Sequence, residues 1–336
     1  MKVLVTGATS LLARRTAESL IARGDEVVCL QRRQAGIDAH QVLGDVRDVD
    51  AVRSAVDGCD AVVHAAAKVG VVGRWEEYRS VNVDGTRVVL EVAQRAGVSR
   101  LVHVSSPAVA HDGGSIVGGL ATPPVTGRRG AWYAESKAIA ETLVLDAASE
   151  VVPVVVVRPH LVWGPEDNQL VGRIVDRARA GRLALVGGGT ALVDTTYIDN
   201  AAAGMVAALD ATRPGASCVG RAYVICNGEP RPIRDLVLGI CRAANIEIEP
   251  RSVPRPVASV LGTTIERAWK LTRRSDEPVL TRFLADQLGT AHWFDPRPAR
   301  DDLGYSPSVS IDEGLRRLQA WFEHAQPGHV QPWLRQ

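Results

Sequence analysis

The chain has 336 residues, of which 46% are hydrophobic and 23% are charged, so it can bury a large core and exceeds the commonest size of a single domain. Its 39 Lys and Arg residues and 38 Asp and Glu residues leave a formal net charge of +1. This balance creates no overall field that would attract nucleic acid or an anionic membrane. The composition therefore favours a small-molecule ligand and argues against a nucleic-acid partner.

The cysteines and the first residues indicate a reducing compartment. Five cysteines, an odd number, are widely spaced and lie in apolar runs, which is typical of reduced core residues. The sequence opens directly on the strand-like segment Met1–Val5, without a charged segment followed by a cleavable apolar stretch. The apolar stretch Val151–Val157 is too short to span a bilayer. We therefore expect a cytoplasmic protein.

Short apolar runs alternate with longer segments of helical periodicity through the first half of the chain. The predicted buried strands are Lys2–Thr6, Glu26–Leu30, Ala61–His64, Arg100–Ser105 and Pro153–Arg158. The predicted helices between them are Ala13–Ala22, Val49–Val56, Val81–Ala96 and Tyr133–Ala147. This order predicts an α/β fold of the Rossmann type, with a doubly wound parallel sheet.

The alternation becomes irregular after Arg158, which predicts a smaller C-terminal lobe that binds substrate. Here we expect a loop at Gly181–Gly189, a strand at Ala222–Cys226, a Pro-rich segment at Pro250–Pro256, and a last helix from Arg316 followed by a loose tail. The predicted dinucleotide-binding domain is 1–164, with 190–226 returning to it. The predicted substrate lobe comprises 165–189 and 227–336.

A candidate pyrophosphate loop follows the first strand, where a helix begins. The predicted cofactor contacts in this loop are Thr6, Gly7, Thr9, Ser10, Leu11 and Leu12. Ser10 and Ala13 replace the second and third glycines of the dinucleotide fingerprint. A Cβ at Ser10 would crowd the phosphates, whereas its hydroxyl could donate a hydrogen bond to them. Taken alone, the loop could equally be an ordinary strand-to-helix turn.

The end of the second strand bears on which dinucleotide is bound. An acidic residue there would hold the ribose 2′-hydroxyl of NAD, but this chain has Gln31-Arg32-Arg33. Two guanidinium groups suit a 2′-phosphate, because arginine offers paired donors and stays charged. We therefore predict that NADP(H) is preferred, at Arg32 and Arg33, with NAD(H) possible. The alternative is a solvated basic turn.

Further predicted cofactor contacts come from later strand ends and helices. They are Asp45, Val46, Ala65, Ala66, Ala67, Asn82, Ser105, Tyr133, Lys137 and Pro159. Asn82 could equally bond to protein backbone instead of the cofactor. Pro159 could equally be a proline that only ends a strand. His64 is predicted to be a packing residue at a strand end, and no metal site is predicted. Asp199 is predicted to cap a helix rather than to act in catalysis.

Tyr133 and Lys137 are four positions apart in a predicted helix, so their side chains project from one face. A tyrosine is almost wholly protonated at neutral pH, and a neighbouring ammonium group stabilises its phenolate. The pair is therefore a candidate proton donor. Together with Ser105-Ser106 upstream and a dinucleotide loop, it predicts carbonyl reduction.

In this order, the motifs resemble the extended short-chain dehydrogenases/reductases, in the branch like 3β-hydroxysteroid dehydrogenases. The landmarks are Thr6-Gly7, Asp45, His64-Ala65-Ala66, Asn82–Thr86, Ser105-Ser106, Tyr133–Lys137, Arg158-Pro159, Trp163–Pro165 and Tyr197–Asn200. A closer likeness, in Val193–Asn200, Asn227–Pro230 and Leu280–Ala285, is to bacterial 2-alkyl-3-oxoalkanoate reductases of long-chain olefin and β-lactone biosynthesis. Ser10 departs from the family pattern.

The resemblance implies NADPH-dependent reduction of the ketone of a long, branched β-keto acid, a lipid-like substrate. It implies that Ser106, Tyr133 and Lys137 are the catalytic residues, with Ser106 bound to the carbonyl oxygen. It also implies a homodimer formed through paired helices. Two other readings stay open at this point: a sterol or nucleotide-sugar dehydrogenase or epimerase of the same superfamily, and a non-catalytic regulator that senses the dinucleotide.

Val257–Thr272 has apolar residues at helical spacing with basic residues toward its end, including Arg267, Lys270, Arg273 and Arg274. An amphipathic lid over the substrate fits this pattern. We favour the alternative of a surface helix packed on the second lobe. A helix that contacts a membrane or a partner enzyme is a third option.

Overall fold

The computed structural model describes residues 1–70, 73–111, 113–127, 131–148, 152–272, 285 and 288–324, without the side chains of 266–272. Within these residues the largest sheet has seven strands, all paired in parallel, in the order β12-β7-β5-β4-β1-β2-β3. The strands are β1 (Lys2–Thr6), β2 (Glu26–Gln31), β3 (His40–Leu43), β4 (Ala61–His64), β5 (Arg100–Val104), β7 (Val154–Pro159) and β12 (Ala222–Ile225). The strand order reverses between β1 and β4, which is where open α/β sheets bind ligands.

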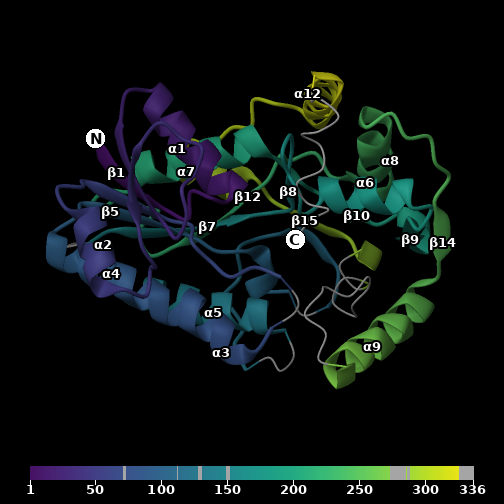
Figure 1. Ribbon diagram of the computed structural model, residues 1–336, viewed down its shortest axis with the longest axis horizontal. Coiled ribbons are helices and arrows are strands. Elements are labelled where there is room, and N and C mark those ends of the chain that lie inside the picture. Colours follow the sequence, from purple (N-terminus) through teal and green to yellow (C-terminus); the bar gives the residue numbers. More distant parts are fainter. Residues whose placement is uncertain are drawn as a thin grey trace.

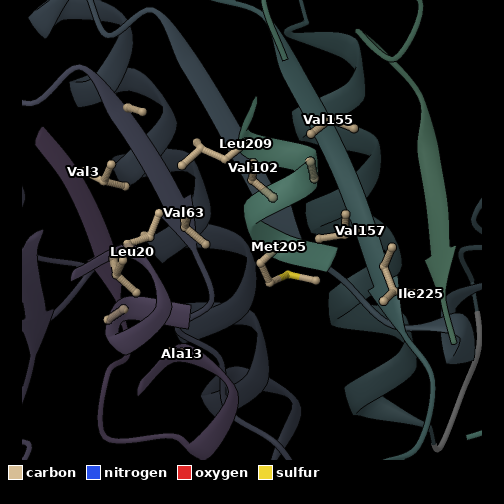
Figure 2. Close-up of a cluster of buried hydrophobic side chains, with 14 of the residues drawn as sticks. Val3, Ala13, Leu20, Val63, Val102, Val155, Val157, Met205, Leu209 and Ile225 are labelled. Atoms are coloured by element: carbon tan, nitrogen blue, oxygen red, sulfur yellow. The ribbon is translucent and has the colours of Figure 1, made fainter. Parts of the chain in front are cut away.

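Helices cover both faces of this sheet, so the predicted doubly wound fold is confirmed (Figure 1). On one face α1 (Leu11–Ala22) and α7 (Ile198–Ala211) pack on alternate strand residues, as Figure 2 shows for Leu20, Met205 and Leu209 against Val63 and Val102. On the other face α2 (Val49–Val56), α4 (Gly85–Ala96) and α5 (Trp132–Asp146) cover the remaining residues. β3 was not predicted, because it is a half-exposed edge strand with little apolar sequence.

The smaller lobe lies beside the large sheet (Figure 1). Its core joins α6 (Val171–Arg179), α8 (Ile233–Ala243) and α12 (Ile311–His324). A second sheet has the order β13-β10-β15-β6. The remaining elements are α3 (Trp75–Tyr78), β6 (Ile116–Gly119), β8 (Val162–Trp163), β9 (Ala184–Val186), β10 (Leu192–Val193), β11 (Thr196–Tyr197), β13 (Arg231–Pro232), β14 (Arg251–Val253), α9 (Arg255–Thr272), β15 (His292–Phe294) and α11 (Arg297–Leu303), with a π-helical turn at Arg79–Asp84 and 3-10 turns at Pro107–Val109 and Gly187–Gly189.

The domain boundary at residue 164 stays a prediction. Some elements pack as this division expects, and others do not. α7 and β12 pack with the large sheet, in line with the predicted return of 190–226. In contrast, β6 pairs with β15 in the second sheet, although residues 116–119 were assigned to the first domain. The predicted loop Gly181–Gly189 contains β9, and the last helix begins at Ile311, before Arg316. The predicted tail from 325 lies outside the described residues.

α9 forms the predicted helix, but three apolar side chains of its first turns are exposed. Val257, Val260 and Leu261 are 48%, 67% and 47% exposed, while Ala258 is fully buried. Small residues therefore form the packed face, because they let the helix backbone approach closely. The expectation that these apolar residues pack on the lobe is wrong for the first turns. The predicted basic residues 267, 270, 273 and 274 lie outside the described side chains. No described helix is both long and apolar enough to cross a membrane.

Candidate active site

A cleft of about 570 Å³ lies at the carboxyl ends of the parallel strands and extends to the smaller lobe. It brings together most of the residues predicted from the sequence. These are Gly7, Thr9, Ser10, Leu11, Leu12, Arg32, Asp45, Val46, Ala65, Ala66, Ala67, Ser105, Ser106, Tyr133, Lys137 and Pro159. Three predicted cofactor contacts, Thr6, Arg33 and Asn82, are not among the lining residues.

Two strand-end loops are pressed together at the floor of the cleft. Gly7 has a φ of +79°, and a Cβ there would lie 2.8 Å from the Cα of Ala66, so only glycine fits. The hydroxyl of Thr6 accepts hydrogen bonds from the backbone N–H groups of Ala65 (3.2 Å) and Ala66 (3.1 Å). Thr6 therefore shapes the loops from beneath instead of facing the cleft.

Ser10 stands at the second glycine position without backbone strain. Its φ of −82° and ψ of 147° are extended values that any residue adopts. The side chain is exposed, lines the cleft and makes no capping hydrogen bond at the start of α1. The backbone at this position therefore does not require glycine, and the hydroxyl is available to a ligand.

At the far end of the cleft, Arg32 in the turn after β2 carries a positive charge, and Asp45, two residues after β3, carries a negative charge. Arg32 is exposed and lines the cleft, whereas Arg33 is exposed and does not. Two hydrogen bonds from Arg47 to Asp45, each 2.8 Å, lower the pKa of that carboxyl, and the charge of Arg32 lowers it further. Gln31 is buried on the cleft wall, and its Oε1 has no hydrogen-bond partner among the described residues.

These features fit a dinucleotide. The Gly7 turn lets backbone approach a phosphate closely at the N-terminus of α1. The unpaired Gln31 oxygen is an acceptor of the kind that a ribose hydroxyl satisfies. Among the described residues, no group of three or more His, Cys, Asp or Glu side chains is arranged to hold a metal ion.

Ser106, Tyr133 and Lys137 meet at the other end of the cleft. Tyr133 and Lys137 come from the first turns of α5, and Ser106 follows β5 and accepts a bond from the N–H of Ala108 at 3.3 Å. Burial raises the pKa of Tyr133, and a hydrogen bond with the side chain of Ser106 partly opposes this. The phenol is therefore protonated at neutral pH and can donate a proton.

Lys137 is buried, with 2% of its surface exposed. Its Nζ donates to the carbonyl oxygen of Val104 at 2.6 Å and lies 3.4 Å from Nε2 of His103. Burial lowers the pKa of Lys137 to about 8, and the charge of Glu141 opposes this decrease. The side chain is therefore mostly charged at neutral pH and loses its charge as the pH rises through about 8.

Buried polar residues hold this end of the cleft in place. Glu141 forms a buried ion pair with Arg158 and accepts a 2.5 Å hydrogen bond from the hydroxyl of Ser105. The Ser105 hydroxyl therefore points to Glu141, although Ser105 lines the cleft. Asn82 donates to Ser136 Oγ (2.9 Å) and to the carbonyl of Lys68 (3.0 Å), and accepts from the N–H of Lys68 (2.6 Å). Because its amide is fully engaged with protein groups, Asn82 supports the site without lining it.

Sequence reasoning missed the wall that the smaller lobe contributes. The additional lining residues there are Leu161, Val162, Asp167, Gln169, Leu170, Arg173 and Ile198. Leu161 has a φ of +41°, a strained value for a branched side chain. Asp167 accepts from the N–H groups of Gln169, Leu170 and Val171, so an Asp four residues before α6 was a usable helix-start signal.

Two other predicted roles are resolved by contacts. Asp199 does not cap α7, because it lies within the helix and pairs with Arg317 at 3.1 Å. The N-cap prediction is therefore wrong, and Tyr197 occupies that position. His64 is a buried strand-end residue as predicted, with both ring nitrogens bonded to threonine hydroxyls, of Thr6 (2.8 Å) and Thr86 (3.0 Å).

Comparison with known proteins identifies this arrangement. The chain is 45% identical over 326 residues to a 2-alkyl-3-oxoalkanoate reductase of Stenotrophomonas maltophilia, covering 95% of this chain and 99% of that protein. It is 30% identical over 340 residues to a 3-beta-hydroxysteroid dehydrogenase of Mycolicibacterium neoaurum, covering 96% and 91%. The fold matches UDP-glucuronic acid 4-epimerase from Bacillus cereus in complex with NAD, with a TM-score of 0.73, 20% identity, and coverage of 96% and 99%.

Residues 3–226 match the model of the NAD dependent epimerase/dehydratase family. This match spans the whole large sheet, from β1 to β12, and therefore every strand end that lines the cleft. The chain belongs to the NAD dependent epimerase/dehydratase family and is an oxidoreductase that uses a nicotinamide dinucleotide.

Proposed function

We propose that this protein is an NADPH-dependent reductase that converts the ketone of a long-chain 2-alkyl-3-oxoalkanoate to the 2-alkyl-3-hydroxyalkanoate, in the biosynthesis of olefins or β-lactones. The observation that carries the proposal is that Ser106, Tyr133 and the buried Lys137 line one otherwise largely apolar cleft. The identity to a reductase of this name over almost the whole of both chains supports the substrate class.

In the proposed reaction a nicotinamide dinucleotide bound in the cleft would supply the hydride for the carbonyl carbon. Tyr133 donates its phenolic proton to the carbonyl oxygen, and Ser106 donates a hydrogen bond to the same oxygen. Lys137 stabilises the tyrosinate that remains, because an ammonium group close to a phenolate favours the charged form. Proton transfer would thus depend on three side chains that line the same cleft.

The proposed dinucleotide site occupies the opposite end of the cleft. The Gly7 turn, Ser10 and the N-terminus of α1 would hold the pyrophosphate, and Ala65–Ala67 would form the floor below it. Arg32 would bind a 2′-phosphate, since its guanidinium lines the cleft and is exposed. Of the two adjacent arginines, Arg32 lines the cleft and supports the preference for NADPH, whereas Arg33 contributes no lining contact.

The proposed acyl site is the wall formed by the smaller lobe. Leu161, Val162, Leu170 and Ile198 contribute apolar surface to the same cleft as Tyr133. Apolar walls of this kind stabilise an alkyl chain by removing its surface from water, at about 0.8 kcal/mol for each buried CH₂ group. A long branched keto acid is therefore a better match than a polar sugar.

The direct test is a substrate panel that follows NADPH oxidation with the purified protein. A synthetic long-chain 2-alkyl-3-keto acid should be reduced, and NADPH should be used better than NADH. A 3-keto sterol and a UDP-sugar serve as competing substrates. Turnover of the sterol without turnover of the keto acid would contradict the proposal.

We also propose a homodimer formed through α4 and α5. These helices pack against each other, and an open groove on them is lined by Leu90, Ile139 and Leu143 together with polar residues. A groove on a helix pair with both apolar and polar lining residues is suited to burial against a second copy. Light scattering coupled to size exclusion should give about twice the mass of the chain, and replacing Leu143 with Glu should give the monomer. A monomeric wild type would contradict this proposal.

A further inference from the structure

Two histidines lie side by side beneath the catalytic lysine. His64 on β4 and His103 on β5 are directly paired in register, and their ring centroids are 5.5 Å apart. Both are buried, at 1% and 0% exposure. They lie opposite each other on adjacent strands and are equally buried, so the difference between their hydrogen bonds is informative.

The bonds of His64 fix its protonation state. Thr6 accepts from two backbone N–H groups, so its own proton goes to Nδ1 of His64. Thr86 donates its proton to the carbonyl of Asn82 at 2.6 Å, so it accepts from the N–H at Nε2 of His64. His64 is therefore neutral, and both of its ring nitrogens have hydrogen-bond partners within the protein.

His103 lacks such partners. Its Nδ1 is buried with no hydrogen-bond partner among the described residues, and its Nε2 lies 3.4 Å from Nζ of Lys137. An ammonium group has no lone pair, so in this contact Lys137 donates and the imidazole accepts. The ring must then carry its proton at Nδ1, where the N–H has no acceptor. A buried unpaired donor costs free energy, which a phenylalanine at this position would avoid.

This cost has an explanation if His103 serves Lys137. We propose that His103 is a positioning residue for the reduction: its Nε2 accepts a hydrogen bond from the Lys137 ammonium and, with the carbonyl of Val104, fixes two of the three N–H directions. The remaining N–H is left for the cleft, which Lys137 lines. The inference rests on the proposed role of Lys137 in the reaction.

The charged surroundings are consistent with this role. Burial and the charge of Lys137 keep the pKa of His103 well below its usual value, and that of His64 falls to about 3 for the same reasons. Glu141, on the next turn of α5, is the nearby anion that favours the ammonium. His103 thus stays neutral at physiological pH and remains an acceptor.

A direct test needs neither substrate nor cofactor. The chain has only four lysines, Lys2, Lys68, Lys137 and Lys270, so NMR of protein labelled with ¹³C-lysine can follow each one. The resonance of Lys137 is the one missing from Lys137→Met. In His103→Phe the pKa of Lys137 should fall by about one or more, since a hydrogen bond to a charged group is lost. In His103→Gln, whose amide oxygen can accept, most of this fall should be absent.

Activity provides the second readout. His103→Phe should lower kcat about tenfold or more, leave KM for the ketone within about twofold, and bring the alkaline decline in rate to lower pH. In the Lys137→Met background the same substitution should cause no further loss, because His103 acts through Lys137. If His103→Phe does not fold, the comparison of His103→Leu with His103→Gln replaces it.

An unchanged Lys137 titration in the variant that lacks the acceptor, or an equal loss of rate with and without Lys137, would overturn the inference. Failure of the substrate proposal is distinguishable from this result. If the wild type does not reduce the keto acid, the NMR titration still reports whether His103 bonds to Lys137.

Discussion

The two ends of the cleft are built differently. At the catalytic end, Lys137, Asn82 and Glu141 are buried and bonded to named protein groups. At the dinucleotide end, Ser10 and Arg32 are exposed and belong to turns. The contrast indicates that the proposed proton transfer would rely on side chains fixed by the fold, whereas the proposed phosphate recognition would rely on exposed side chains in turns. Substitutions at the two ends should therefore affect different measurements.

The largest effect is expected at the buried end. Tyr133→Phe removes the proposed proton donor and keeps the ring, so kcat should fall by roughly 10²–10⁴-fold. Binding of the dinucleotide, measured by fluorescence titration, should be nearly unchanged, because the phenol is needed only in the reaction. A variant that retains its rate would remove Tyr133 from this role, and loss of dinucleotide binding would show that the two ends are not independent.

The pH dependence of kcat should also arise from the proposed catalytic end of the cleft. The pKa of Lys137 is lowered to about 8, so its charge is present below pH 8 and is lost as the pH rises through this value. A neutral amine does not stabilise the tyrosinate, so kcat for ketone reduction should decline above about pH 8, approaching tenfold for each pH unit. Dinucleotide affinity should show no parallel decline. A rate that stays constant to pH 10 would contradict the role of the lysine charge.

A backbone change tests the floor between the two ends. Gly7→Ala places a Cβ at 2.8 Å from the Cα of Ala66 on a backbone with φ of +79°. It should lower dinucleotide affinity about tenfold and the free energy of unfolding by about 1–3 kcal/mol. The matched control is Gly24→Ala, where φ is +92° and nothing lies within 4 Å, so it carries the strain without the clash. Equal losses from both variants would remove any special role for the close approach.

The exposed end is tested by separating two arginines that are adjacent in sequence. Arg32→Ala should weaken NADPH about tenfold and leave NADH nearly unchanged, because one charged contact to the 2′-phosphate is lost. Arg33→Ala is the matched control and should change neither affinity by much, since Arg33 does not line the cleft. Dissociation constants for both dinucleotides decide the matter. Equal weakening of NADPH and NADH by Arg32→Ala would contradict the phosphate assignment.

The sequence predicted the buried parts better than the walls. The strands were found because buried parallel strands read as apolar runs, and Ser106, Tyr133 and Lys137 were found because they sit in short segments at strand ends and on one helix. Leu161, Leu170 and Ile198 were missed because an apolar side chain carries no sign of the cleft it faces. Arg33 and Asn82 were predicted to contact the cofactor but do not line the cleft, because sequence adjacency does not define which side chain faces a ligand.

The smallest effect is expected at Ser10, where two substitutions separate the Cβ from the hydroxyl. Because Ser10 has an extended backbone and an exposed side chain without a capping bond, its hydroxyl is free to donate to a phosphate. Ser10→Ala and Ser10→Gly should then weaken dinucleotide binding alike, by roughly twofold to tenfold, the worth of one neutral hydrogen bond. Tighter binding by Ser10→Gly alone would show instead that the Cβ crowds the phosphates, and this exposed turn would then be as sterically constrained as the buried end.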